Sequence, residues 1–335
     1  MKSISLKAYA KVNLSLDVTG KLDNGYHTLR SVMQAVNLFD EVTVIDNVEG
    51  NDNRIELKLA DSNDSSLMNL IPAGNDNLAY KAANAMANKY KADSKVDISI
   101  TLLKNIPVSA GLAGGSTDAA AVILALAYLW ELDDNLDNLV KVGKTVGADV
   151  PFCLISNAKN NPECGFADDY LASSTALAEG IGEILTPISS LNGSLIFVKP
   201  PISVSTPVVY SLYDERIDLV KNRPNTEILI DAINAKSSGT APVDAPVYAA
   251  LGENMSIIKE NMVNVLEPIA RSEYLEVARI LDTLSVLLPN EKVFMSGSGP
   301  TVVAFFEHSD EAESKFYEIT KEYGKDVKTY SMSLL

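Results

Sequence analysis

Hydrophobic and polar residues alternate strictly near the start of the chain, between positions 4 and 18. The apolar positions are Ile4, Leu6, Ala8, Ala10, Val12, Leu14, Leu16 and Val18, and the residues between them are Ser5, Lys7, Tyr9, Lys11, Asn13, Ser15 and Asp17. A period of two predicts a strand with one buried face. The Asn24-Gly25 pair that follows predicts a tight turn, because both residues tolerate a positive φ.

The pattern along the rest of the chain predicts a mixture of strands and helices. Strands are expected at 40–45, 54–60, 96–104, 194–199 and 301–307, and helices at 77–90, 119–130, 136–146, 273–288 and 311–323. The segment 119–130 is apolar on all sides, which is typical of a helix buried inside a protein. The polar segment 156–174 is expected to be a surface insertion, and 235–250 a loop.

This mixture predicts an α+β protein, and 335 residues allow two ordinary domains. The boundary is expected within 185–194, where a turn-rich segment precedes a new strand. It divides the chain into domains 1–187 and 188–335.

Composition narrows the classes of partner. The formal net charge is −16, from 28 Lys and Arg against 44 Asp and Glu, which argues against binding nucleic acid or anionic membranes. The chain has two cysteines, Cys153 and Cys164, and two histidines, so we expect free thiols and no zinc site. We find no signal peptide and no apolar run of membrane-spanning length. These features favour a cytoplasmic protein.

A glycine-rich stretch opens the apolar segment. In "GLAGGSTD", residues 111–118, three glycines stand beside Ser116 and Thr117. Such a turn lets backbone approach a ligand, and the free N–H groups at a helix start attract anions. Neither the Walker loop nor the dinucleotide fingerprint fits its spacing. Alone, the stretch leaves two interpretations: a phosphate site, or a tight turn in which Ser116 or Thr117 caps the helix.

Several segments together resemble the GHMP kinase superfamily. They are "AYAKVNLSLDVTGKLDNGYHTLRSVMQ" (8–34), "IPVSAGLAGGSTDAAA" (106–121), "GADVPF" (147–152), "AEGIGEILTPI" (178–188), "KPPISVSTPVVY" (199–210) and "SGSGPTVVAFFE" (296–307). The resemblance covers most of the chain, and its most specific parts are the first segment and "GADVPF". It implies a two-domain GHMP kinase fold: an N-terminal ribosomal-protein-S5-domain-2-like α/β domain that binds ATP, and a C-terminal ferredoxin-like α+β domain.

The order of these segments matches one member of the superfamily. The resemblance implies ATP-dependent phosphorylation of the 2-hydroxyl of a cytidine-diphosphate-linked methylerythritol, in the non-mevalonate route to isoprenoids. It implies ATP as co-substrate with Mg²⁺, small-molecule partners only, and a monomer or weak homodimer.

The resemblance assigns the catalytic positions to Lys11 and Asp149. Considered alone, Lys11 is a solvated surface lysine, and Asp149, two residues before Pro151, is a natural helix N-cap. In the family these positions hold a catalytic lysine and a base. A weak base suffices, because a loose phosphoryl-transfer transition state needs little early deprotonation. We therefore expect Asp149 to orient the hydroxyl and accept its proton late, while Lys11 stabilises Asp149 and the charge of the transferring group.

The resemblance also assigns the binding residues. On the substrate side they are Asn13, Tyr26, His27, Met33, Ile181, Thr206 and Tyr210, with His27 hydrogen-bonding cytosine and the two tyrosines stacking on it. On the ATP side they are Asn77, Leu78 and Lys104 around adenine, and Pro107, Ala110, Gly111, Leu112, Ala113, Gly114, Gly115, Ser116 and Thr117 in the loop. Ser116 is the candidate near the metal, and the "SGSGPT" turn is expected to be mainly structural.

Some features depart from the family pattern. Ala110 and Ala113 stand where relatives have glycine, the segment 156–174 is longer than expected, and 235–250 matches nothing. Two alternatives stay open. Another GHMP kinase, for homoserine, mevalonate or a sugar, is disfavoured by the "GYH" turn and Tyr210, because those substrates carry no cytosine. A non-catalytic GHMP fold is disfavoured by the presence of Lys11, Asp149 and the loop.

Overall fold

The structure is a computed structural model that describes residues 1–47, 54–60, 71–72, 74–238, 253–324 and 327–335. Its first half contains β1 (Lys2–Lys21), β2 (His27–Asp46), β3 (Arg54–Leu59), α2 (Leu78–Tyr90), β4 (Asp97–Leu103), α3 (Gly114–Leu129), α4 (Leu136–Val146), α5 (Val150–Asn160), β5 (Thr175–Glu179) and β6 (Ile184–Pro187). Two single 3₁₀ turns, Gly74–Asp76 and Pro162–Cys164, complete this part.

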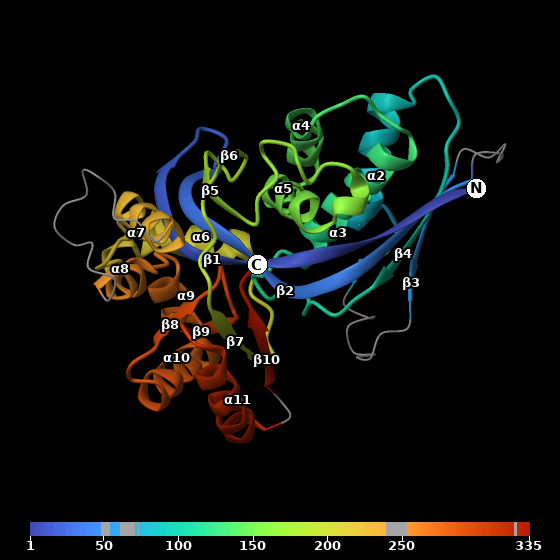
Figure 1. The fold of residues 1–335 in the computed structure, drawn as a ribbon. Coiled ribbons are helices and arrows are strands. Elements are labelled where there is room, and N and C mark those ends of the chain that lie inside the picture. The colour runs from blue at the N-terminus through green and yellow to red at the C-terminus, as the bar shows by residue number, and fades with distance from the viewer. Residues whose placement is uncertain (48–53, 61–70, 73, 239–252, 325–326) are drawn as a thin grey trace.

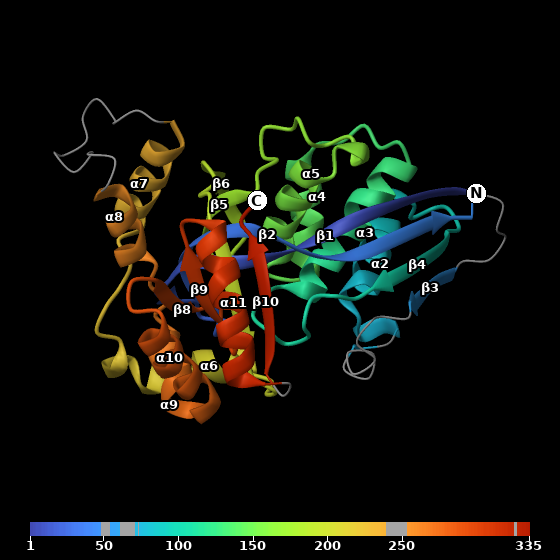
Figure 2. The ribbon, with the colours of Figure 1, turned by 60° about the horizontal axis from the view of Figure 1, so that its bottom comes forward.

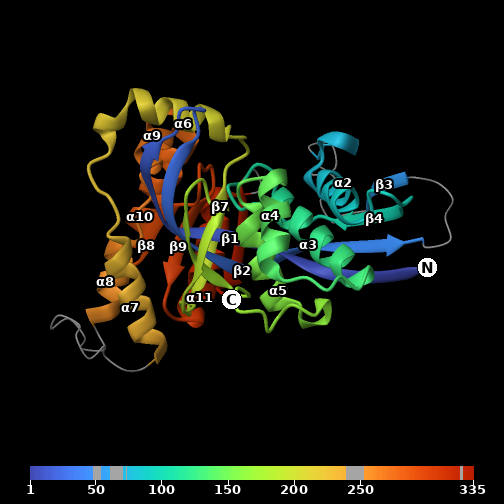
Figure 3. The ribbon, with the colours of Figure 1, turned by 90° about the horizontal axis from the view of Figure 1, so that it is seen from above.

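The strands of this half form one mixed sheet with the order β3-β4-β2-β5-β6, and β1 pairs with β2. β1 and β2 make a long antiparallel hairpin whose turn holds Gly25 at φ 88°, as the Asn-Gly pair predicts. Helices α2–α5 lie together on one side of this sheet (Figure 1; Figure 3). The apolar part of α3, from residue 119 onward, is buried at the centre of that layer, as its pattern predicts.

The second half contains a second sheet, in which the predicted ferredoxin-like arrangement is confirmed. It comprises β7 (Ser194–Lys199), α6 (Thr206–Glu215), the 3₁₀ turn Ile217–Leu219, α7 (Thr226–Ser238), α8 (Glu253–Asn261), α9 (Glu267–Glu273), α10 (Leu275–Leu287), β8 (Lys292–Met295), β9 (Val302–Phe306), α11 (Ser309–Tyr323) and β10 (Lys328–Ser333). The antiparallel order is β10-β7-β9-β8, and α11 lies along β10 (Figure 2).

The chain passes from the first sheet to the second between β6 and β7, within the predicted boundary segment. The division into 1–187 and 188–335 remains a prediction, because β1 contributes to the cores on both sides. Its side chains enter three hydrophobic clusters in turn: Leu6 and Ala8 join the helical layer, Ala10, Val12 and Leu14 join β7, β9, α7 and α8, and Leu16 and Val18 join α9, α10 and the other face of the second sheet.

Two predictions from the pattern need correction. β1 has buried residues on both faces from position 8 to 16, because its polar face lies under the glycine loop and the "SGSGPT" turn: the N–H of Lys11 donates to the Leu112 carbonyl at 3.2 Å. Segment 156–174 begins inside α5, where Ser156 and Asn157 are fully buried.

The polar residues of this segment have a structural reason. β1 pairs only with β2 among the strands, so its outer edge needs other partners. Asn157 and Asn161 supply them: their side-chain carbonyl oxygens accept from the N–H groups of Tyr9 (3.0 Å) and Lys7 (2.9 Å). The segment 235–250 lies largely outside the described residues, and its first four residues end α7.

Candidate active site

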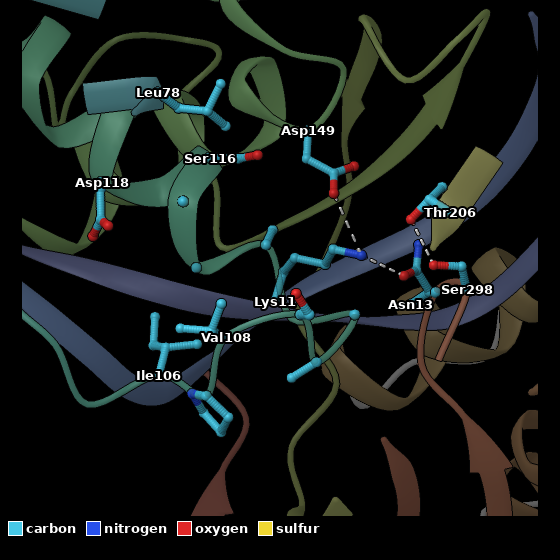
Figure 4. Close-up of a pocket in the computed structure, with 18 of the residues that line it drawn as sticks. Lys11, Asn13, Leu78, Ile106, Val108, Ser116, Asp118, Asp149, Thr206 and Ser298 are labelled. Carbon is cyan, nitrogen blue, oxygen red and sulfur yellow. Dashed lines mark hydrogen bonds and ion pairs between the residues drawn. The ribbon is translucent and has the colours of Figure 1, made fainter. Parts of the chain in front are cut away.

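A cleft with a volume of about 360 Å³ lies between the glycine loop, the β1–β2 hairpin and the start of α6 (Figure 4). It brings together most of the predicted site residues: Lys11, Asn13, Met33, Asn77, Leu78, Lys104, Pro107, Ala110, Gly111, Ala113, Gly114, Gly115, Ser116, Asp149, Thr206 and Tyr210. These positions span 200 residues of sequence, so the fold itself assembles the site.

Lys11 lies at the centre of the cleft and is not a surface lysine. Only 3% of the residue is exposed, and its Nζ donates to Asn13 Oδ1 at 2.6 Å. The amide of Asn13 in turn donates to Ser31 Oγ on β2 at 2.8 Å. Lys11 and Asn13 therefore share one face of β1, as their spacing predicts, and the hairpin holds both in place.

Asp149 faces Lys11 from the opposite wall. Asp149 Oδ2 lies 3.8 Å from Lys11 Nζ, and 37% of the side chain is exposed to the cleft. The residue occupies the N-cap position of α5, but its side chain makes no capping hydrogen bond. Because the carboxylate points to the lysine instead of the helix start (Figure 4), the geometry favours a chemical role over simple capping.

The glycine loop ends directly in α3. Ala113 is the N-cap residue in the left-handed region (φ 59°), with no side-chain capping bond, so neither Ser116 nor Thr117 caps the helix. The first turn of α3 thus presents backbone N–H groups that lack intrahelical partners, which is the arrangement that binds phosphate. Ser116 borders the cleft, whereas Thr117 is fully buried and donates to Asn157 Oδ1 at 3.2 Å.

Gly111 shows why the loop keeps a glycine there. Its φ is 74°, and a Cβ would lie 2.5 Å from the Ser296 carbonyl oxygen and 3.0 Å from that of Gly299. The "SGSGPT" turn therefore packs against the loop, and its Gly297 and Ser298 also line the cleft. Ala113 adopts its positive φ without glycine, so the departure from the family pattern leaves the loop formed.

The far end of the cleft is apolar and rests on a buried charge cluster. Leu78, Ile106 and Val108 line it, and Asn77 caps α2 by accepting from the Ala79 N–H at 2.9 Å. Beneath them Lys104 pairs with Asp40 and, at 2.5 Å, with Asp118.

Sequence reasoning missed Asp118, although one acidic residue beside a wholly apolar helix was a usable signal, since a buried charge needs a partner. Its Oδ1 has no hydrogen-bond partner among the described residues. Burial raises the pKa of Asp118 to about 8, with the Lys104 ammonium opposing this.

At the opposite end of the cleft, Tyr210 lines the wall and His27 stacks on it. The rings of His27 and Tyr210 stack with centroids 4.9 Å apart, and the Thr206 and Ser298 hydroxyls are hydrogen-bonded at 2.7 Å. Five predicted residues do not line the cleft: Tyr26, His27, Leu112, Ile181 and Thr117. Tyr26 is 59% exposed at the hairpin turn, and Leu112 is buried. Their predicted roles remain untested by this geometry.

The cleft contains few candidate metal ligands. Among the described residues, no three His, Cys, Asp or Glu side chains gather into a metal-binding cluster. Mg²⁺ needs no such cluster, because it binds through one or two protein oxygens together with phosphates and water. The Ser116 hydroxyl, which borders the cleft, fits that requirement. Both cysteines are buried free thiols, as predicted. None of the helices in the described part of the chain combines the length and apolar character needed to cross a membrane.

Comparisons with known proteins show the family of the chain. Residues 77–157 match the GHMP kinase N-terminal domain, and residues 244–326 match the GHMP kinase C-terminal domain. The chain is similar to proteins named 4-diphosphocytidyl-2-C-methyl-D-erythritol kinase from Clostridium acetobutylicum, with 38% identity over 96% of this chain and 98% of that one, and from Acetivibrio thermocellus, with 41% identity over 93% of each.

Solved structures show the same relationship. The crystal structure of a 4-(cytidine 5'-diphospho)-2C-methyl-D-erythritol kinase has a TM-score of 0.69 at 27% identity and covers 99% of both chains. A homoserine kinase from Cytophaga hutchinsonii has a TM-score of 0.63 at 16% identity over 100% of this chain and 95% of its own, which shows the shared fold alone. The chain therefore belongs to the 4-diphosphocytidyl-2-C-methyl-D-erythritol kinase family of GHMP kinases.

Proposed function

We propose that this chain transfers the γ-phosphoryl group of ATP to the 2-hydroxyl of 4-diphosphocytidyl-2-C-methyl-D-erythritol. The observation that carries the proposal is the placement of Lys11 and Asp149, 3.8 Å apart, across one cleft from the first turn of α3. An alcohol between Asp149 and the helix start lies where in-line attack on a bound triphosphate is possible.

In this reaction a bond forms between the substrate oxygen and the γ-phosphorus, and the bond from that phosphorus to the β–γ bridging oxygen breaks. The hydroxyl proton passes to Asp149, and ADP leaves. The Lys11 ammonium, held by Asn13, stabilises the negative charge of the transferring group. The free backbone N–H groups at the start of α3 bind the negatively charged phosphates of ATP. Mg²⁺ bound at Ser116 would neutralise phosphate charge.

The substrate end supports the cytidyl substrate over that of other GHMP kinases. His27, Tyr210 and Tyr213 form an aromatic group beside the cleft, and a planar base has the shape to bind there. Homoserine and mevalonate have no such group. We further propose that Tyr26 closes over the base from the hairpin turn, since it is exposed and has no ring partner in the described structure.

The test uses purified protein with ATP and Mg²⁺ and each alcohol in turn, and measures ADP release. Turnover with the cytidyl substrate is expected. Turnover only with homoserine or mevalonate would assign another GHMP activity, and binding without any turnover would assign a non-catalytic role.

The role of Asp149 is tested by Asp149→Asn. Loss of the base is expected to lower kcat by roughly 100- to 10,000-fold while ATP affinity stays unchanged. Asp168→Asn is the control, because it removes one exposed carboxylate outside the cleft and should leave kcat unchanged. An undiminished kcat in Asp149→Asn would remove this residue from the mechanism.

A further inference from the structure

Asp214, near the end of α6, holds two residues of the β1–β2 hairpin. Its Oδ1 lies 2.7 Å from His27 Nε2, and its Oδ2 accepts from Lys21 Nζ at 2.6 Å. His27 and Lys21 face each other across the hairpin, and the tip of the hairpin lies beside α6 (Figure 3). One carboxylate therefore fixes the cleft's aromatic end to the C-terminal part of the chain.

The His27 ring has little freedom to turn. Its side chain is 8% exposed, Tyr210 stacks on it, and Tyr213 meets it edge to face at 6.2 Å. Tyr213 is itself held by Arg223, whose guanidinium donates to the phenolic oxygen at 2.9 Å. The orientation of the His27 imidazole ring is therefore fixed.

The contact with Asp214 determines where the imidazole proton lies. An ionised carboxylate only accepts hydrogen bonds, so the Nε2 that faces Asp214 Oδ1 carries the proton. In a neutral imidazole the other nitrogen is then an acceptor. His27 Nδ1 has no hydrogen-bond partner among the described residues and is not one of their fully buried unpartnered atoms, so its lone pair is accessible to a ligand.

We propose that Asp214, by fixing the tautomer of His27, makes the site select cytosine over uracil. The proposal rests on the function proposed above. Cytosine and uracil have the same size and differ at position 4, where cytosine carries an amino donor and uracil a carbonyl acceptor. An acceptor at Nδ1 pairs with the amino group and opposes the carbonyl. Asp214 is therefore a positioning residue that acts through His27.

Lys21 makes the proposal testable by a single substitution. In Asp214→Asn the side chain keeps its shape, but one end becomes an NH₂ donor. The Lys21 ammonium is donor-only, so it holds the amide carbonyl on its own side and turns the NH₂ toward His27 Nε2. Nε2 must then accept, the proton moves to Nδ1, and His27 presents a donor to the base.

Selectivity is measured as the ratio of kcat/KM for the cytidine-diphosphate-linked substrate to that for its uridine analogue. In Asp214→Asn this ratio is expected to fall at least about tenfold, since one hydrogen bond is lost for cytosine and one gained for uracil. Glu215→Gln removes a charge from the next residue and should leave the ratio unchanged. An unchanged ratio in Asp214→Asn would overturn the proposal.

The tautomer is read independently by ¹⁵N NMR of the imidazoles at about pH 8, where an ordinary imidazole is neutral. The chain has two histidines, so His308→Gln assigns both sets of signals. The wild-type protein should show His27 protonated at Nε2 alone, and Asp214→Asn should show the proton at Nδ1. Protonation of Nδ1 in the wild type would overturn the proposal. If the wild type turns over neither nucleotide substrate, the proposed function fails, whereas the tautomer result still stands.

Discussion

Replacing Asn157 with alanine removes the amide that joins the outer edge of β1 to α3. The Asn157 side chain is fully buried and makes four contacts: it accepts from the Tyr9 N–H (3.0 Å) and the Thr117 hydroxyl (3.2 Å), and its NH₂ lies 3.1 Å from the Thr117 carbonyl and 3.0 Å from the Thr117 hydroxyl. No other strand covers this edge within the described residues.

The cost follows from the groups that lose their partner. The Tyr9 N–H and the Thr117 hydroxyl both lie in buried surroundings, and each unsatisfied buried group costs about 1–3 kcal/mol. Removing the side chain also leaves a small void. We therefore expect the free energy of unfolding to fall by about 2–5 kcal/mol, which is a large part of the stability of a typical protein.

Urea unfolding followed by tryptophan fluorescence measures this loss. The single tryptophan, Trp130, follows α3 directly, so its signal reports on the helical layer in which Asn157 lies. Asn88→Ala, at an exposed position of α2, is the control and should change stability by less than about 0.5 kcal/mol. A loss below about 1 kcal/mol in Asn157→Ala with an unchanged m-value would refute the reasoning.

Two further predictions concern the cleft. Gly111→Ala should raise the KM for ATP and lower the free energy of unfolding by about 1–3 kcal/mol, because a methyl group there meets the Ser296 carbonyl. Gly324→Ala is the control: it also has a positive φ but open space around it, and it should leave the KM unchanged. Equal KM values in the two variants would show that contact between the loop and the turn is unimportant. Lys104→Met should lower stability by about 3–5 kcal/mol by leaving two buried carboxylates unpaired. Burial raises the pKa of Asp118 to about 8 with Lys104 in place, and loss of the ammonium raises it further, so this loss should be greatest well above pH 8 and should shrink as pH falls toward about 8; a loss independent of pH in urea unfolding would contradict the assignment.

Much of the fold follows from local pattern. The alternation in β1, the apolar part of α3 and the Asn-Gly turn all specify their conformation through neighbouring residues, and the strand, the helix and the turn all form, although the single buried face expected of β1 is wrong. The short strands β8 and β10 were not predicted, since four to six residues of mixed character give a weak period. Asn157 was misassigned because polarity alone does not distinguish a solvated side chain from one that satisfies a buried strand edge.

The site, like the fold, was predictable from the sequence only where local pattern determines it. The glycine loop is contiguous, so its segment could be found from its cluster of glycines and hydroxyls, and phosphate binding could be expected there as one of two interpretations. Lys11 and Asp149 lie 138 positions apart in sequence, and only the family resemblance paired them before the structure placed them 3.8 Å apart. Asp214 was missed because its partners, His27 and Lys21, come from another element, whereas the place of Asp118 before an apolar run was a signal of a buried charge, although no local pattern reveals its partner Lys104.

β1 contributes side chains to three hydrophobic cores, and this affects how the protein folds during synthesis. The Asn13 N–H lies 3.5 Å from Ser296 Oγ, 283 positions later, and Leu16 exchanges backbone hydrogen bonds with Val263 and Val265. At ribosomal rates of about 5–20 residues per second, roughly 15–60 seconds separate the emergence of Asn13 from that of its partner. Throughout that interval β1 can pair with β2, but the C-terminal residues that cover its other edge and complete two of its three cores are still missing. A nascent chain of this enzyme is thus a natural client for chaperones that shield unpaired strands, and the cleft can be completed only after nearly all of the sequence has left the ribosome.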